Sequence, residues 1–216
     1  MASTKTAANE DASARERILQ TAEELFAEDG FNGVSMRDIA SKARVGLGQL
    51  TYYFESKRDL YLTVFLNSGF RIISERKRLL TEARAKYGSR PIPLKLLIRS
   101  YVMPYLDYAR TDGATYVRLY ARLHSEPADL AEEVRRRVYD ETTLDYADAF
   151  KKSLPHIPEE VIYWRLVFMM GTYNFAFITS GRLEVMSRGA LTSTNLDAVV
   201  KQVLPFIEAG LRAPVP

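Results

Sequence analysis

The chain has 216 residues, of which 47% are hydrophobic and 26% are charged, so it is long enough to bury one large core or two smaller ones. Cysteine is absent, which excludes disulfides, thiolate metal sites and a cysteine nucleophile. The net charge is only +3, so we expect any nucleic-acid interface to be a local basic patch and not a basic domain.

Two segments bear on the compartment in which the protein works. Residues 1–12 are small and polar and lack the apolar core of a signal peptide, so we expect a flexible tail there. The most apolar stretch, residues 161–178, is interrupted by Arg165 and Asn174, which indicates a buried helix and not a membrane span. These features predict a cytoplasmic protein.

Hydrophobic residues recur at helical spacing along the whole chain, and no stretch alternates with the period of a strand. The pattern predicts an all-α fold of about nine helices. Serine and acidic residues at capping-box spacing mark three helix starts, at Ser13 and Glu16, Ser35 and Asp38, and Ser56 and Asp59. Gly30 ends the first of these helices.

Beyond the third capping box, the spacing predicts a long helix over residues 56–86 and a series of further helices. These cover residues 94–110, 116–124, 127–154, 159–179 and 196–211. Pro104 should kink the first helix of this series. We expect residues 181–194 to form a polar loop and residues 213–216 to fray.

The most informative segment runs from Ser35 to Leu60 and reads SMRDIASKARVGLGQLTYYFESKRDL. It places a short capped helix, a turn over residues 43–46 and a second short helix ending near Phe54. Two short helices joined by a tight turn after a longer helix are typical of a helix-turn-helix unit. Residues 35–58 carry five basic residues against two acidic ones, which is the local positive patch that DNA binding requires.

This segment resembles the DNA-binding signature of the TetR family of transcriptional regulators over roughly the first quarter of the chain. The matching residues are Ile39, Ala40, Val45, Tyr52, Tyr53, Phe54, Ser56, Lys57 and Leu60. The resemblance implies a homodimeric repressor that leaves a palindromic operator when a small molecule binds. It also implies a DNA-binding domain over residues 13–57 and a ligand-binding and dimerisation domain over residues 58–212.

Four residues depart from the family pattern. Arg44 stands where the turn often has glycine, and Gly46 stands where serine or threonine often caps the second helix. We therefore expect a strained backbone at Arg44. Thr51 stands in place of a frequent tyrosine, and Tyr53 in place of a frequent histidine. These two differences affect which operator sequence we expect, whereas the expectation of DNA binding is unchanged.

The DNA contacts follow from the chemistry of the side chains. Phosphates are bound by lysine, arginine, tyrosine hydroxyls and helix N-termini, whereas base edges are read by side chains such as Gln49, which can pair with adenine. Gly48 would let the backbone approach the duplex, and Thr51 could touch a thymine methyl group. The predicted DNA-binding residues are Ser35, Arg37, Arg44, Leu47, Gly48, Gln49, Thr51, Tyr52, Tyr53 and Lys57.

The second half of the chain is rich in aromatic residues, many at same-face helical spacing. Core packing accounts for more than half of them, but so many tyrosines need polar partners if they are buried. A cavity with an apolar wall and a few polar groups would suit an aromatic or amphipathic ligand. The predicted pocket residues are Tyr101, Tyr105, Tyr116, Tyr120, His124, Phe168 and Tyr173.

The resemblance implies that the last two long helices form the dimer as a four-helix bundle. The residues expected at this interface are Gly171, Phe175, Val199, Val203, Phe206 and Ile207. The sequence leaves open which face of residues 159–179 lines the pocket and which face meets the partner.

No motif in the sequence predicts catalysis or a cofactor. The two histidines, His124 and His156, have no metal-binding partner at helical spacing, and nucleotide-binding and nucleophile motifs are missing. We therefore expect no enzyme activity, no metal and no cofactor. The partners expected are double-stranded DNA, a small-molecule effector and a second copy of the chain. A helix-turn-helix activator, or a regulator controlled by a protein, remains the alternative.

Overall fold

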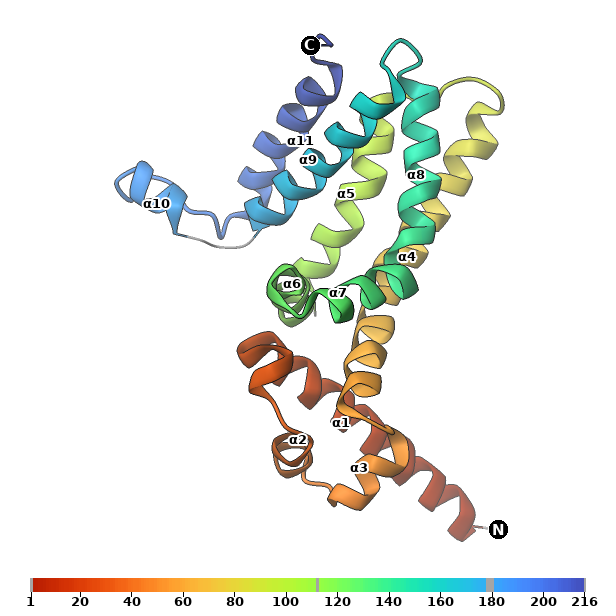
Figure 1. Ribbon diagram of the computed structural model, residues 1–216, viewed down its shortest axis with the longest axis vertical. Helices are drawn as coiled ribbons and strands as arrows, with labels where there is room; N and C mark the ends of the chain where they lie inside the picture. Colours follow the sequence, from red (N-terminus) through yellow and green to blue (C-terminus); the bar gives the residue numbers. More distant parts are fainter. Residues whose placement is uncertain (1, 112, 178–180, 216) are drawn as a thin grey trace. The chain divides into compact units, whose positions relative to one another are not determined.

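The computed structural model describes residues 2–111, 113–177 and 181–215, and within these ranges the chain forms helices and no strands. The α-helices are α1 (Ala2–Gly33), α2 (Met36–Ala43), α3 (Leu47–Tyr53), α4 (Lys57–Tyr87), α5 (Leu94–Arg110), α6 (Ala114–Arg122), α7 (Ala128–Val134), α8 (Asp140–Ser153), α9 (Glu159–Phe177), α10 (Arg182–Met186) and α11 (Leu196–Arg212) (Figure 1). A 3₁₀ turn over Leu123–Ser125 precedes α7, and a π-helical turn over Arg135–Tyr139 precedes α8. The predicted all-α fold is confirmed.

The chain divides into two compact units. Unit 1 consists of residues 1–70 and 118–138, and unit 2 consists of residues 71–117 and 139–216. Segment 118–138, which includes α7, is thus far from residues 1–70 in sequence but belongs to the same unit. The boundary that we predicted near residue 57 did not anticipate this segment.

The core of unit 1 is formed by the apolar faces of the first four helices. Its fully buried side chains include Ile18, Phe26, Ile39, Leu50, Phe54, Leu60 and Tyr61. The rings of Phe26 and Tyr61 meet edge to face with 4.9 Å between centroids, which joins α1 to α4. The spacing of the apolar residues in the sequence therefore sets how α2 and α3 pack on α1.

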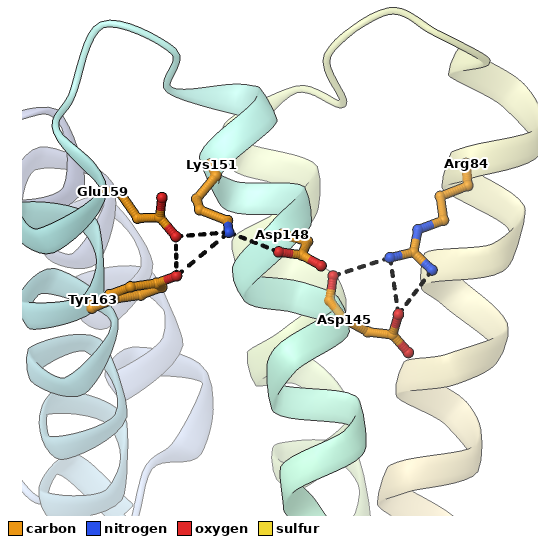
Figure 2. A network of polar contacts seen from close by, with 6 residues as sticks. All are labelled: Arg84, Asp145, Asp148, Lys151, Glu159 and Tyr163. Carbon is orange, nitrogen blue, oxygen red and sulfur yellow. Dashed lines mark hydrogen bonds and ion pairs between the residues drawn. The ribbon is translucent and has the colours of Figure 1, made fainter.

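Unit 2 is a helical bundle in which α5 packs on α8 and α11, and α9 packs on α8 and α11. Ion pairs add links between its helices (Figure 2). Arg84 of α4 pairs with Asp145 of α8 at 3.1 Å, and Lys151 of α8 pairs with Glu159 of α9 at 3.0 Å. Because these side chains are 30–59% exposed, their ion pairs contribute little, and the apolar core must supply most of the stability.

Several local predictions need correction. Residues 2–12 of the predicted tail belong to α1, so this part of the tail is helical and Ser13 does not begin the helix. Alanine, lysine and glutamate in this stretch favour helix strongly enough to extend it. The helix predicted over 127–154 is interrupted by the π-helical turn, and the predicted polar loop contains α10. Leucine, glutamate and methionine in α10 explain its helical state.

Candidate functional site

Helix α2 begins with the predicted capping box. The Ser35 hydroxyl accepts from the Asp38 N–H at 3.2 Å, and the Asp38 carboxylate accepts from the Ser35 N–H at 2.9 Å. Hydrogen bonds from the Ser35 side chain and backbone lower the pKa of Asp38. Asp38 is therefore a carboxylate at neutral pH that fixes the start of α2, and the Ser35 side chain is engaged within the cap.

The turn after α2 contains the strain that the sequence predicted. Arg44 lies in the left-handed region, with φ 55° and ψ 49°, and its N–H donates to the carbonyls of Ala40 and Ser41. Gly46 precedes α3 in an extended conformation and offers no side-chain cap, also as predicted. The left-handed turn ends α2 and sets the direction of α3.

Helix α3 has one buried face and one exposed face. Leu50 is fully buried, and Phe54 anchors the C-terminal end of the helix. The exposed residues of α3 are Leu47, Gly48, Gln49, Thr51 and Tyr52. Tyr52 is 80% exposed, which is unusual for so large a ring and leaves its hydroxyl accessible.

Two residues of α3 also make contacts within the helix. The Thr51 hydroxyl donates to the Leu47 and Gly48 carbonyls, both at 3.1 Å, so its remaining groups are the methyl and the oxygen lone pairs. The half-buried ring of Tyr53 meets that of Tyr52 edge to face at 5.4 Å.

Lys57 has a structural role that sequence reasoning missed. Its ammonium group donates to the carbonyls of Phe31 at 2.8 Å and Val34 at 2.9 Å and lies 4.3 Å from the centre of the Phe31 ring. These bonds tie the first turn of α4 to the end of α1. An ammonium group has three donors, so these two carbonyls use two of the three N–H groups.

Unit 2 brings three of the predicted pocket residues together. The ring of Tyr173 in α9 lies 6.1 Å from that of Tyr101 and 5.7 Å from that of Tyr105, both in α5. All three side chains are buried. Burial strongly raises the pKa of Tyr105, so its hydroxyl stays protonated at any physiological pH.

A buried arginine, which the sequence analysis did not identify, belongs to this cluster. Arg76 of α4 is 4% exposed, donates to the Tyr101 carbonyl at 2.7 Å and to the Tyr173 hydroxyl at 3.4 Å, and stacks on the Tyr101 ring at 3.9 Å. The Tyr146 hydroxyl donates to the Arg76 carbonyl at 3.0 Å. No sequence signal marks Arg76, because it stands in a run of charged residues that reads as a solvated helix surface.

The other predicted pocket residues lie outside this cluster. The Tyr116 hydroxyl is hydrogen-bonded to that of Tyr139, elsewhere in unit 2. Tyr120 and His124 belong to unit 1, where their rings lie 6.4 Å apart. Phe168 is exposed on α9 beside Trp164, which corrects the expectation that it would be buried in a pocket.

The predicted interface residues fall into two groups. Val203 and Ile207 are buried within unit 2, because with Leu211 they form the inner face of α11. Val199 is half-buried, whereas Gly171, Phe175 and Phe206 are exposed. We call the large exposed side chains of α9 and α11 the aromatic face, and they are Tyr163, Trp164, Val167, Phe168, Phe175 and Phe206.

No group of three or more histidine, aspartate or glutamate side chains among the described residues is arranged to hold a metal ion. None of the described helices combines the length and the hydropathy that a membrane crossing needs.

Two family models match the chain. Residues 18–64 match the model described as bacterial regulatory proteins, tetR family, and residues 99–210 match the tetracyclin repressor-like C-terminal domain. The second match alone covers more than half of the chain.

Curated relatives match mainly through the N-terminal part. The chain is 33% identical over 93 residues to the HTH-type transcriptional repressor BepR of Brucella suis, a match that covers 43% of this chain and 42% of BepR. It is 40% identical over 48 residues to the probable HTH-type transcriptional regulator YttP of Bacillus subtilis, covering 22% of this chain and 23% of YttP. The chain thus spans less than half of the length of these relatives.

Solved structures share the fold across nearly the whole chain. The TetR family regulator PfmR of Thermus thermophilus aligns with a TM-score of 0.61 at 15% identity, covering 93% of this chain and all of PfmR. FadR of Bacillus subtilis, solved in complex with stearoyl-CoA, aligns with a TM-score of 0.57 at 18% identity over 91% of this chain and 98% of FadR. Proteins of this class are transcriptional regulators and not enzymes. This chain belongs to the TetR family of helix-turn-helix transcriptional regulators.

Proposed function

We propose that the protein is a transcriptional repressor that binds a palindromic operator as a dimer and releases it when a small molecule binds unit 2. The observation that carries this proposal is the exposed face of α3, which follows a capped α2 and a left-handed turn and projects Gln49 and Tyr52 outward. A short helix anchored by Leu50 and Phe54 and exposed on its other side suits the major groove.

The contacts that we propose separate sequence reading from backbone binding. Gln49 reads an adenine, the Thr51 methyl group contacts a thymine, and Leu47 and Gly48 allow close approach to the duplex. The positive charges of Arg37, Arg44 and Lys57, the hydroxyls of Tyr52 and Tyr53, and the N-terminal amides of α2 after Ser35 bind phosphates.

Dimerisation through α9 and α11 explains the aromatic face. Trp164 and Phe168 are 58% and 62% exposed, and an apolar surface of this size is typical of an interface. Two helix-turn-helix units, one from each protomer and here called heads, would be related by a two-fold axis. They would match half-sites about one helical turn of DNA apart.

The effector that we propose is amphipathic and binds around Tyr101, Tyr105 and Tyr173. The tyrosine rings offer an apolar wall, while their hydroxyls and the Arg76 guanidinium offer donors for a polar or anionic group. FadR, with the same fold, was solved with stearoyl-CoA, so a long-chain acyl-CoA is a suitable first probe.

Selection of binding sites from a random duplex pool, followed by fluorescence anisotropy, tests this function. We expect a palindromic consensus, and we expect Gln49→Ala to weaken binding by about 1–3 kcal/mol per half-site at particular base pairs. Equal loss on consensus and random DNA would refute the reading role of Gln49. Titration with stearoyl-CoA and a screen of amphipathic compounds tests release. If no compound changes affinity, control by a protein partner is the better hypothesis.

A further inference from the structure

Residues 181–195 form an ordered arm between α9 and α11. Hydrogen bonds within the arm fix its shape: the Glu184 carboxylate accepts from the Ser193 N–H at 2.7 Å and from the Ser193 hydroxyl at 2.8 Å. The Ser187 hydroxyl accepts from the Leu191 N–H at 3.0 Å. The arm therefore holds its conformation through its own polar groups, without burying its apolar side chains.

The arm exposes large apolar side chains. Met186 is 77% exposed, and Val185 and Leu191 are each more than half exposed. In Figure 1 the arm with α10 projects away from α9 and α11. An ordered projection that exposes three large apolar residues is costly in water unless another surface covers it.

A groove of about 890 Å³ separates the arm from α11 and joins the aromatic face. Met186 and Leu191 of the arm line it together with Val199 of α11. Phe175 and Phe206, which belong to the aromatic face, also line it. The exposed apolar surface of the arm is thus continuous with the surface on which the proposed dimer depends.

The areas favour a second copy of the chain as the occupant. A large aromatic side chain buries about 150–250 Å² in full, so each partly exposed side chain of the aromatic face adds on the order of 100 Å². Its six residues supply about 600 Å², whereas a stable interface needs about 800 Å² per partner. Val185, Met186 and Leu191 raise the total to about 900 Å², which meets the requirement.

We propose that this arm clasps a second copy of the chain, whose aromatic side chains fill the groove between the arm and α11. The inference rests on the proposed dimer and extends it. It adds α10 to an interface for which the aromatic face of α9 and α11 alone supplies too little area. In a two-fold dimer each arm grips the other protomer, so the contact occurs twice.

Cross-linking tests the proximity directly, because the chain contains no cysteine of its own. A tagged Met186→Cys chain is mixed with an untagged Trp164→Cys or Phe168→Cys chain and treated with a short bis-maleimide. We expect a cross-linked heterodimer in at least one mixture. Leu144→Cys, an exposed position on α8, replaces Met186→Cys as the control and should give none. Absence of a heterodimer in both mixtures overturns the proposal.

Affinity distinguishes the arm from the dimer itself. Analytical ultracentrifugation should show at least a tenfold rise in the dimer Kd for Met186→Glu, with helicity unchanged by circular dichroism and with Leu144→Glu like the parent. Trp164→Glu tests the aromatic face. If Trp164→Glu dissociates the dimer and Met186→Glu does not, the arm proposal fails and the dimer stands. If neither does, both fail. An apolar dye that binds the groove of the intact dimer would also overturn the proposal.

Discussion

Arg44 and Lys57 show how single basic residues of the helix-turn-helix combine structure with the proposed binding. Arg44 occupies a left-handed turn position that glycine would adopt without strain. Lys57 joins two helices through the carbonyls of Phe31 and Val34. We propose a phosphate partner for the positive charge at the strained Arg44, whereas the charge at Lys57 contributes to the fold of unit 1 as well.

Arg44→Gly should therefore change stability and DNA binding in opposite directions. A non-glycine residue in the left-handed region costs about 1–2 kcal/mol, so we expect the free energy of unfolding to rise by about that amount. Loss of one phosphate contact should lower affinity for all sequences and reduce the salt slope by about one per head. Urea unfolding and anisotropy at several salt concentrations measure both effects. An unchanged salt slope would mean that Arg44 is only a solvated charge, and Arg44→Lys should keep the slope.

Lys57→Ala should instead lower both the free energy of unfolding and the affinity for DNA. Two carbonyls lose a charged donor, so we expect the free energy of unfolding to fall by about 1–3 kcal/mol. Affinity for operator and random DNA should fall together, because the contact proposed is with a phosphate. Arg37→Ala, at an exposed position, is the matched control and should weaken DNA binding without loss of stability. If Lys57→Ala destabilises the fold but binds DNA normally, its role is structural only.

At the scale of helices, segment 118–138 holds the end of α1. The Glu126 carboxylate accepts from the Phe31 N–H at 3.0 Å, directly after Gly30, whose φ of 73° breaks the helix. Arg58 of α4 pairs with Asp129 and Glu133 of α7, both at 2.7 Å. The residues before and after this segment belong to unit 2. The segment is therefore a covalent connection between the unit that contains the tyrosine cluster and the unit that contains the DNA-binding helices.

Glu126→Ala should weaken the attachment of α1 to segment 118–138. Loss of the acceptor leaves the Phe31 N–H without its carboxylate, so we expect the free energy of unfolding to fall by about 1–3 kcal/mol. Operator release by an effector should weaken as well, because α1 is no longer tied to the segment. Glu126→Gln retains an acceptor and should preserve most of the stability and most of the effector-driven release. Asp129→Asn removes only an exposed ion pair and should lower the free energy of unfolding by less than about 1 kcal/mol. Thermal unfolding and operator titration with and without effector provide the measurements.

The elements that sequence reasoning predicted well are those with local signals. The capping box at Ser35 and the strained Arg44 depend on neighbours within a few residues, so their pattern was sufficient. The tyrosine partner Arg76 depends on contacts distant in sequence, and α10 has only 5 residues, too few to show a helical period in the residue pattern. Val203 and Ile207 were assigned to the dimer because one apolar stripe cannot show which surface covers it.

At the scale of the whole molecule, regulation requires that ligand binding and operator binding affect one another. By linkage, a ligand that lowers operator affinity by a given factor binds the operator-bound protein more weakly by the same factor. A coupling of about 1–3 kcal/mol is sufficient for release. In the proposed dimer both helix-turn-helix units must keep the spacing of the half-sites, so a change in either protomer would weaken operator binding.

Tyr105→Phe tests where this coupling begins. The substitution removes one buried hydroxyl and keeps the ring, so operator affinity without ligand should be unchanged. If the hydroxyl binds the effector, the ligand Kd should rise by roughly tenfold, or about 1.4 kcal/mol. Tyr87→Phe, a half-exposed tyrosine outside the cluster, is the control. Calorimetry gives the ligand Kd, and anisotropy gives the release at saturating ligand. If the Tyr105 hydroxyl contacts the ligand equally in the operator-bound and the released conformer of the protein, only the ligand Kd changes. If it contacts the ligand only in the released conformer, the maximal release from the operator falls as well. A ligand Kd equal to that of the parent protein would place the effector away from Tyr105.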